Sequence, residues 1–363
     1  MLNNLLYTKH IKSMQHKTNK GVTKMKLRNL FYLMLVLPFL FIYTGCSKTE
    51  DSPVEPTAVN EAQVLAEYLE ANGDFLNLTA PAVITATDVN SLRLTNPTKL
   101  LVIDIRSASD FETKGHIEGA KQVDLKNIVT YMQTANSTQY EKVVIACYSG
   151  QTAGYAVSLL RLLGYTNVFS LKWGMSSWNA SCASSWAAPS IGNNYTNFVT
   201  TSTPKAAAGS LPVLNTGKKT GKEILEARIS TLLATASASP FDDIKVAWGT
   251  VTGALSNYYI VNYWSQTDYD KGHLPGAIQY TPKADLKLSA NLKTLPTNKT
   301  IALYCYTGQT SAQVVTILKI LGYDAKSLLF GVNSMNYDWM ATAGISNQFK
   351  STEINAFPFV TGK

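Results

Sequence analysis

Short apolar runs alternate with stretches of helical period along most of the chain, and the whole pattern occurs twice. The runs lie at 100–105, 143–146 and 167–171 in the first half and at 258–263, 301–304 and 327–330 in the second. Amphipathic stretches at 60–72 and 221–233 open the two halves with the spacing of helices. Strands that alternate with helices predict an α/β fold, in which each half is a parallel sheet with helices on both faces.

A cysteine-containing loop follows the middle apolar run of each half. It reads Cys147-Tyr-Ser-Gly-Gln-Thr152 in the first half and Cys305-Tyr-Thr-Gly-Gln-Thr310 in the second. A tight loop between a strand and a helix directs backbone N–H groups at one point, and the start of the helix adds positive potential. Both effects favour a thiolate and a bound anion. Cys147 and Cys305 are therefore predicted to be catalytic nucleophiles.

The other residues of the two loops are candidates for binding a substrate, through backbone amides and side-chain hydrogen bonds. They are Tyr148, Ser149, Gly150, Gln151, Thr152, Tyr306, Thr307, Gly308, Gln309 and Thr310. Arg106 is a further candidate, because Asp104 and Arg106 either hold an anionic substrate or form a structural contact under the loop. The second half has Asn262 and Trp264 at these positions, so the ion pair is lost there.

The two histidines outside the first 45 residues, His116 and His273, both lie in a Gly-His-x-x-Gly-Ala motif. Their shared position favours a turn that is held by hydrogen bonds over direct proton transfer.

Cys182 lies outside the repeated motifs and is either a packed thiol or a resolving partner that closes a disulfide with Cys147. The sequence shows no metal-ligand cluster, and no cofactor is expected.

The net charge of +8 comes almost entirely from the first 45 residues, which carry seven basic and no acidic side chains. The remainder has 25 basic against 24 acidic residues, a balance that gives no case for nucleic-acid binding. The basic stretch runs into an apolar segment at 30–43, which is about the length of a signal-peptide core and short for a membrane span. Met25, just before Lys26 and Arg28, is an alternative start.

The apolar segment ends in Tyr43-Thr44-Gly45-Cys46, which resembles the lipobox of bacterial lipoproteins. That resemblance implies a leader at 1–45 and lipidation of Cys46, with a non-cleaved anchor or ordinary secretion as alternatives. A polar tether that contains proline follows at 46–59. We therefore expect an exported protein, anchored by lipid to the membrane of the cell envelope on its periplasmic or surface side.

Similar endings at 211–218 and 357–363 place the boundary between the halves near Lys218, which gives domains at 60–218 and 219–363. From the cysteine to the terminal glycine, Gly217 or Gly362, the chain takes 70 residues in the first half and 57 in the second. About thirteen additional residues are therefore expected in the first half, within the Ala/Ser/Asn-rich stretch 179–209.

Together these motifs resemble two rhodanese-like sulfurtransferase domains, over most of the chain from about Asn60 onward. The resemblance rests on the order and spacing of Val102-Ile-Asp104-Ile-Arg106, the two histidine motifs, the two cysteine loops and the Gly-Tyr pairs that end the following helices. It implies that the loop cysteine takes a sulfane sulfur from a donor such as thiosulfate or mercaptopyruvate and becomes a persulfide. The sulfur then passes to a thiol or cyanide. The implied partners are a small sulfur-containing anion and a thiol acceptor, and a protein partner is unknown.

The alternatives belong to other classes of protein. A cysteine phosphatase needs a longer loop that closes on an arginine, whereas Ala153 or Ser311 stands at the sixth position after the cysteine. Degenerate rhodanese-like units could bind an anion or a partner protein without turnover, and Cys182 could make the protein a redox sensor.

The resemblance also bears on the sulfur donor. In rhodanese-like proteins that are specific for thiosulfate, basic residues directly follow the cysteine, and this chain lacks them. The donor therefore stays open.

Overall fold

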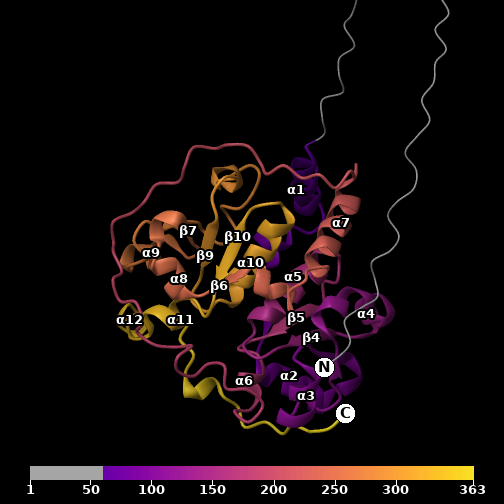
Figure 1. Cartoon of the computed structure of the whole chain (residues 1–363). Coiled ribbons are helices and arrows are strands. Elements are labelled where there is room, and N and C mark those ends of the chain that lie inside the picture. The colour runs from indigo at the N-terminus through magenta and orange to yellow at the C-terminus, as the bar shows by residue number, and fades with distance from the viewer. Residues whose placement is uncertain (1–59) are drawn as a thin grey trace, which may run out of the picture. The chain divides into compact units, whose positions relative to one another are not determined.

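The computed structural model describes residues 60–363, which form two α/β units of the same architecture (Figure 1). The predicted leader at 1–45, the tether at 46–59 and the lipidation site at Cys46 lie outside the described residues. Each unit is built on a five-stranded parallel sheet, as the alternation of strands and helices predicts.

The sheets have equivalent strand orders, β1-β5-β4-β2-β3 in the first unit and β6-β10-β9-β7-β8 in the second. The strands of the first unit are β1 (Val83–Ile84), β2 (Leu100–Asp104), β3 (Lys121–Gln122), β4 (Lys142–Ala146) and β5 (Val168–Leu171). Those of the second unit are β6 (Lys245–Val246), β7 (Tyr259–Asn262), β8 (Ile278–Gln279), β9 (Ile301–Tyr304) and β10 (Ala325–Leu328). The central strands β4 and β9 lead into the cysteine loops, so each loop lies at the carboxyl edge of its sheet, where parallel sheets bind ligands.

Helices cover both faces of each sheet. Those of the first unit are α1 (Glu61–Ala71), α2 (Ala86–Thr95), α3 (Ala108–Lys114), α4 (Ile128–Thr134), α5 (Gln151–Leu162) and α6 (Met175–Trp178). Those of the second are α7 (Gly221–Leu233), α8 (Trp248–Thr252), α9 (Gln266–Lys271), α10 (Gln309–Ile320), α11 (Val332–Met335) and α12 (Tyr337–Thr342). Because side chains alternate along a strand, Ile103 of β2 packs in the same core as α1, α4 and α5, whereas Val102 packs with α2, α3 and α6.

The predicted helices and strands agree closely with those observed. The helix predicted at 221–233 is α7, and a capping box of Thr220 and Glu223 satisfies the free N–H groups at its start. The strand predicted at 327–330 begins two residues earlier, as β10. Eight further short helical turns lie outside these elements. Of these, η3 (Leu125–Asn127) and η5 (Pro240–Asp243) contribute to the cavity described below, and η1 (Phe75–Thr79) lies in the equivalent stretch of the first unit.

The two units pack through equivalent helices. Helix α5 contacts α10, and α1 contacts α7 (Figure 1). Ser158 of α5 donates a hydrogen bond to the carbonyl of Gln313 in α10 at 3.1 Å, and the Gln313 side chain accepts one from the backbone N–H of Ala82 at 2.9 Å. These contacts are buried, and they join the two cores into one.

Each unit also sends an extended segment across the other. The backbone of Val199 pairs with that of His273 in the second unit, and the backbone of Val360 pairs with that of His116 in the first. Figure 1 shows the C-terminal end of the chain beside α3 of the first unit.

The crossing segments correct the predicted equivalence of the two endings. Val199 follows Cys147 by 52 residues and Val360 follows Cys305 by 55, so Val199 is the counterpart of Val360. The thirteen additional residues therefore do not lie before this point, and residues 200–218 are the connection that leads to α7. The domain limits at 218 and 219 stay a prediction.

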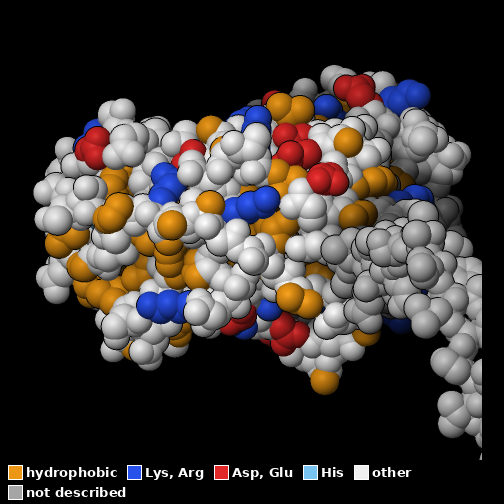
Figure 2. All heavy atoms as spheres, turned by 90° about the horizontal axis from the view of Figure 1, so that it is seen from above, with side chains coloured by type: hydrophobic (Ala, Val, Ile, Leu, Met, Phe, Trp, Pro, Cys, Tyr) orange, Lys and Arg blue, Asp and Glu red, His pale blue; other side chains and the backbone are white. Residues whose placement is uncertain are grey.

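Among the described residues, no helix is long and apolar enough to cross a membrane. Basic and acidic side chains are interspersed on the face seen in Figure 2, in line with the nearly balanced charge of the chain after residue 45.

Candidate active site

The first cysteine loop surrounds a sulfur atom with backbone amides. The N–H of Gly150 donates to Sγ of Cys147 at 3.1 Å, and that of Ala153 donates to the same atom at 3.3 Å. Gly150 is the residue before α5 and has a φ of 85°, which turns the chain from strand into helix. The loop therefore places the sulfur at the start of a twelve-residue helix, as the sequence predicts.

The second loop repeats this geometry. The N–H groups of Gly308 and Ser311 lie 3.2 and 3.3 Å from Sγ of Cys305, and Gly308 has a φ of 77°. The hydroxyl of Thr307 lies 4.0 Å from the same sulfur. Both loops thus provide a ring of amides around a cysteine sulfur.

A glycine turn directly beneath each loop fixes its backbone. Gly174 has a φ of 62°, and a Cβ at this position would lie 2.5 Å from the carbonyl oxygen of Cys147. Gly331 has a φ of 55°, and a Cβ there would lie 2.2 Å from the carbonyl oxygen of Cys305. Neither position can hold a side chain, because the conformation and the space both require glycine.

Burial of Cys147 works against the predicted thiolate. The residue is 1% exposed, and burial raises the pKa of its thiol above the ordinary value of 9.0, although the amides of Ala153, Ser149 and Gly150 act to lower it. Cys305 is 2% exposed. The expectation of a low thiol pKa at Cys147 is therefore wrong for the protein without substrate, because loss of hydration outweighs the amide ring.

A buried ion pair supports the first loop from below. The guanidinium of Arg106 contacts both carboxylate oxygens of Asp104, the closest at 2.7 Å, and also donates to the carbonyls of Cys182 at 2.8 Å and Gly115 at 2.7 Å. Burial would lower the pKa of Arg106, but the contacts with Asp104 raise it. Because these partners engage the guanidinium, the structure supports the structural interpretation of Arg106 over substrate binding.

Aromatic side chains replace the ion pair under the second loop. The indole of Trp264 stacks on the ring of Tyr306, with ring centroids 4.8 Å apart and planes 3° from parallel. Asn262 donates to the hydroxyl of Tyr304 at 2.9 Å, and Tyr304 stands where the first unit has Ala146. The larger Tyr304 therefore occupies space under this loop and receives the hydrogen bond from Asn262.

A tyrosine and an aspartate clamp each loop to the helix before the histidine motif. The hydroxyl of Tyr148 donates to Asp110 at 2.7 Å, and that of Tyr306 donates to Asp268 at 2.7 Å. The hydrogen bond from Tyr148 is the main reason why the pKa of Asp110 is lowered. Tyr148 also lies under the guanidinium of Arg106, whose central carbon is 5.8 Å from the ring centroid.

The two predicted glutamines face the opposite unit instead of the sulfur. The side chain of Gln151 accepts a hydrogen bond from the N–H of Phe330 at 2.9 Å, and that of Gln309 accepts one from the N–H of Trp173 at 2.8 Å. Both glutamines are buried. Their prediction as substrate ligands is not supported, because each carbonyl is engaged in holding the turn beneath the other loop.

A cavity of about 630 Å³ opens in front of Cys147. Arg106, Tyr148 and Thr152 of the predicted binding set line it. The second unit lines its other side with Ser239, which lies between α7 and β6, and with Lys245, the first residue of β6. The first site is therefore built by both units.

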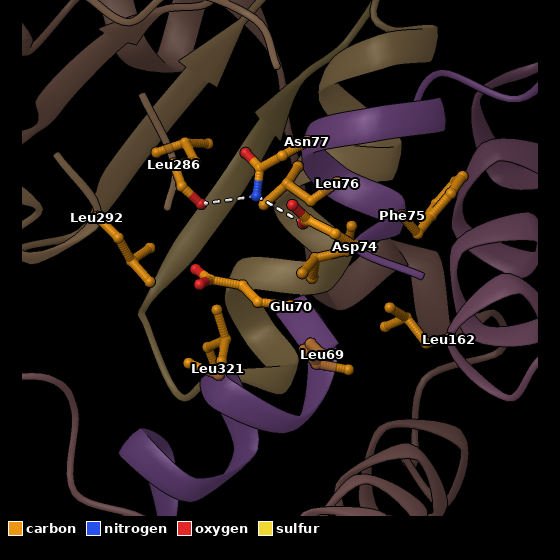
Figure 3. Close-up of a pocket in the computed structure, with 12 residues that line it drawn as sticks. Leu69, Glu70, Asp74, Phe75, Leu76, Asn77, Leu162, Leu286, Leu292 and Leu321 are labelled. Atoms are coloured by element: carbon orange, nitrogen blue, oxygen red, sulfur yellow. Dashed lines mark hydrogen bonds between the residues drawn. The ribbon is translucent and has the colours of Figure 1, made fainter. Parts of the chain in front are cut away.

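The equivalent stretch of the first unit, between α1 and β1, faces the second unit but leaves little space. Asn77 donates to the carbonyl of Leu286 at 3.3 Å and to Asp74 at 2.7 Å (Figure 3). The cavity among these residues measures about 20 Å³. Tyr263, whose counterpart in the first unit is Ile105, is buried and accepts a hydrogen bond from the N–H of Lys283 at 3.2 Å.

Comparison with known proteins identifies the family to which this arrangement belongs. A family model described as "Rhodanese-like domain" matches residues 85–181 and 255–336. The thiosulfate sulfurtransferase GlpE of Pseudomonas fluorescens is 35% identical over 78 residues, which cover 22% of this chain and 69% of the relative. The chain belongs to the rhodanese family. The GlpE of Shewanella oneidensis is 30% identical over 92 residues, 25% of this chain and 88% of the relative.

A solved structure titled with the rhodanese fold shares less of the sequence. The structure of SseA from Escherichia coli, titled as a 3-mercaptopyruvate sulfotransferase with the rhodanese fold, is 15% identical. It covers 68% of this chain and 97% of its own, with a TM-score of 0.25.

The histidines of the two rhodanese units hold turns, as the sequence predicts. The ring of His116 stacks on Phe111 at a centroid distance of 3.5 Å, and its Nδ1 lies 2.9 Å from the carbonyl of the same residue. His273 makes the same contacts with Tyr269, at 3.6 and 2.8 Å. These interactions pin the segment that the opposite extension crosses.

Cys182 is a buried, free thiol of the first rhodanese unit. It packs with Val102 and Trp178, and burial raises the pKa of its thiol to about 11. The structure supports the interpretation of a packed thiol over a resolving cysteine, because Cys182 does not line the cavity at Cys147 and the two residues pack in different cores of the unit. Among residues 60–363, no group of three or more His, Cys, Asp and Glu side chains could hold a metal.

Several cavity residues of the rhodanese site were not found from the sequence. Gln122 lines the cavity and donates to the carbonyl of Arg106 at 3.0 Å, and Gln279 makes the equivalent bond to Trp264 at 2.8 Å. The signal was present, since both glutamines stand two residues after the alanine of the histidine motif. Asp124 and the contribution of Lys245 gave no such signal, because they are not repeated.

Proposed function

We propose that the protein is a sulfurtransferase that carries sulfane sulfur on Cys147 as a persulfide. The observation that carries this proposal is the ring of amides at 3.1 and 3.3 Å from Sγ, at the edge of a cavity large enough for a substrate. Membership of the rhodanese family supports it, as does the name of the relatives, thiosulfate sulfurtransferase.

The reaction needs few groups from the protein. The thiolate of Cys147 attacks the outer sulfur of the donor, a sulfur–sulfur bond forms, and the donor's own bond to that sulfur breaks with the electron pair leaving on the remainder. In a second step a thiol or cyanide takes the outer sulfur and returns the thiolate. Because burial raises its pKa, the Cys147 thiol first loses its proton to solvent. The amides of Gly150 and Ala153 then stabilise the negative charge on the thiolate and the persulfide, so the loop itself needs no side-chain base.

Cys305 is proposed as a second sulfur carrier. Its sulfur has the same pair of amide donors, at 3.2 and 3.3 Å. The buried Tyr263 stands where the first unit has Ile105 beside the cavity, so we expect Cys305 to react more slowly than Cys147.

A non-catalytic function is the second candidate, and one observation favours it. Both loop cysteines are almost fully buried, at 1% and 2% exposed. In this alternative the amide rings bind an anion, or the units bind a partner protein, without transfer of sulfur.

We further propose that the protein acts outside the cytoplasm, held at the membrane by lipid on Cys46. The support for this proposal is the sequence alone, namely the basic stretch, the apolar segment and the lipobox-like ending.

Sulfur loading tests the proposed function. The purified protein is treated with thiosulfate or an organic persulfide, freed of small molecules and analysed by intact mass, together with Cys147→Ser, Cys305→Ser and the double variant. We expect the wild type to gain at least one sulfur atom, which cyanide removes, and Cys147→Ser to lose most of the gain. Failure of every donor to load the folded wild type would favour the binding function.

A further inference from the structure

The cavity at Cys147 is much larger than a small inorganic donor requires. Its volume of about 630 Å³ is in the range of pockets that enclose ligands of some tens of atoms. Thiosulfate, with five heavy atoms, would contact only the part next to the sulfur. The remaining space points to a donor with an organic group.

The charges around the cavity do not favour a dianion. Its lining contains two cations, Arg106 and Lys245, and both are paired with carboxylates. Arg106 is held by Asp104 at 2.7 Å, and Lys245 by Asp242 at 2.5 Å. Asp124, which also lines the cavity, adds a further negative charge. The buried Asp104 neutralises Arg106 and Asp242 neutralises Lys245, so the charge of Asp124 is left over and the site is slightly negative beyond the amide ring.

The neutral part of the lining suits a short organic chain. Ile105 and Leu125 offer apolar surface, and the hydroxyls of Ser107 and Ser239 offer hydrogen bonds. Asp124 uses one oxygen to cap η3, accepting from the N–H of Lys126 at 2.8 Å, and its side chain is exposed. An ammonium group of the ligand would find its partner in this carboxylate.

We propose that the sulfur donor at Cys147 is an organic persulfide that carries an ammonium group, of the type of cysteine persulfide, and not thiosulfate. This inference rests on the proposed function. The thiolate attacks the outer sulfur of R–S–S–H, the new bond forms between Cys147 and that sulfur, and R–S⁻ leaves with the electron pair of the broken bond. The proton stays on the transferred sulfur, and no oxidant or reductant is needed.

The test compares three probes by their rate of sulfur loading on Cys147, measured by intact mass in the Cys305→Ser variant. They are cysteine persulfide, N-acetylcysteine persulfide, which lacks the ammonium, and thiosulfate. We expect the loading rate to fall in that order, by a factor on the order of five between the two persulfides. Asp124→Asn keeps an oxygen that can cap η3, and we expect it to remove most of the rate difference between the two persulfides and to raise the rate of loading from thiosulfate. Asp270→Asn removes an exposed carboxylate of α9; as the matched control it should leave the order of the three loading rates unchanged.

The outcomes separate the two proposals. Equal or faster loading from thiosulfate overturns the donor class but leaves sulfur transfer intact. An unchanged preference in Asp124→Asn overturns the role of the ammonium. If the three probes all fail to load a folded protein, the proposed function itself fails.

Discussion

The two cysteine loops have nearly the same amide ring and very different surroundings. Under Cys147 lies a buried Asp104–Arg106 ion pair, and in front of it a cavity of about 630 Å³. Under Cys305 lie Trp264, stacked on Tyr306, and Tyr304, which fills space beside Asn262. Yet the distances from the two sulfurs to their amides agree within 0.1 Å, at 3.1 and 3.3 Å against 3.2 and 3.3 Å.

The difference shows which contacts determine the loop. The features that both units share are the left-handed glycine at the start of the helix, the glycine turn beneath the loop and the clamp between tyrosine and aspartate. The ion pair differs and is therefore one of two ways to fill the space below. The surroundings then decide how much space lies in front of the sulfur, while the loop decides how its charge is stabilised.

The largest effect is expected from breaking the ion pair. Asp104→Ala leaves the guanidinium of Arg106 buried without its carboxylate, which lowers the free energy of unfolding by about 3–5 kcal/mol. The matched change Asn262→Ala removes one neutral hydrogen bond and costs about 1–2 kcal/mol. Urea unfolding of both variants measures the difference. Equal losses would show that the two supports are energetically equivalent.

The next effect concerns pH. Because the pKa of the Cys147 thiol lies above 9.0, its alkylation rate in Cys305→Ser should rise about tenfold per pH unit between pH 7 and 9, without a plateau. The unfolded chain loses this proton at the ordinary value, so the free energy of unfolding should fall as pH rises above 9. Alkylation followed by mass spectrometry checks the first part, and a plateau near pH 7 would contradict it.

The smallest effect comes from exchanging the residues that border the two sulfurs. Tyr263→Ile should speed alkylation of Cys305 by up to about tenfold, because it removes a buried ring from the approach. Ile105→Tyr should slow alkylation of Cys147 by a similar factor, since Ile105 lines the cavity. Tyr259→Phe, which changes a partly buried tyrosine of β7, is the control. If both exchanges leave the alkylation rates unchanged, these two residues do not explain the expected difference in reactivity between Cys147 and Cys305.

The sequence predicted the elements that carry strong periodicity, including α7 and the strands before both cysteine loops. It also predicted the amide ring, because a repeated loop between strand and helix has a known geometry. The two-residue edge strands β1, β3, β6 and β8 were too short to give a pattern. The raised pKa of Cys147 was missed because it depends on burial, which local sequence does not report.

Contacts between the units were equally beyond the sequence pattern. Gln151 and Gln309 look like substrate ligands, since a loop beside a cysteine is the usual place for them. In the folded chain each reaches the backbone of the opposite unit, at Phe330 and Trp173. Lys245 belongs to the second unit and lines the cavity at the first cysteine, a relation that depends on how the two units pack together.

The exchanged backbone pairings at His116 and His273 make the two halves mutually dependent. A polypeptide ending near residue 200 would contain all five strands of the first sheet but lose the segment around Val360 that pairs with His116, together with the wall that Ser239 and Lys245 supply to the cavity at Cys147. The two halves of the repeat are therefore not independent copies, because each pairs with the histidine turn of the other. The second half therefore contributes to the site of the first cysteine whether or not Cys305 itself reacts.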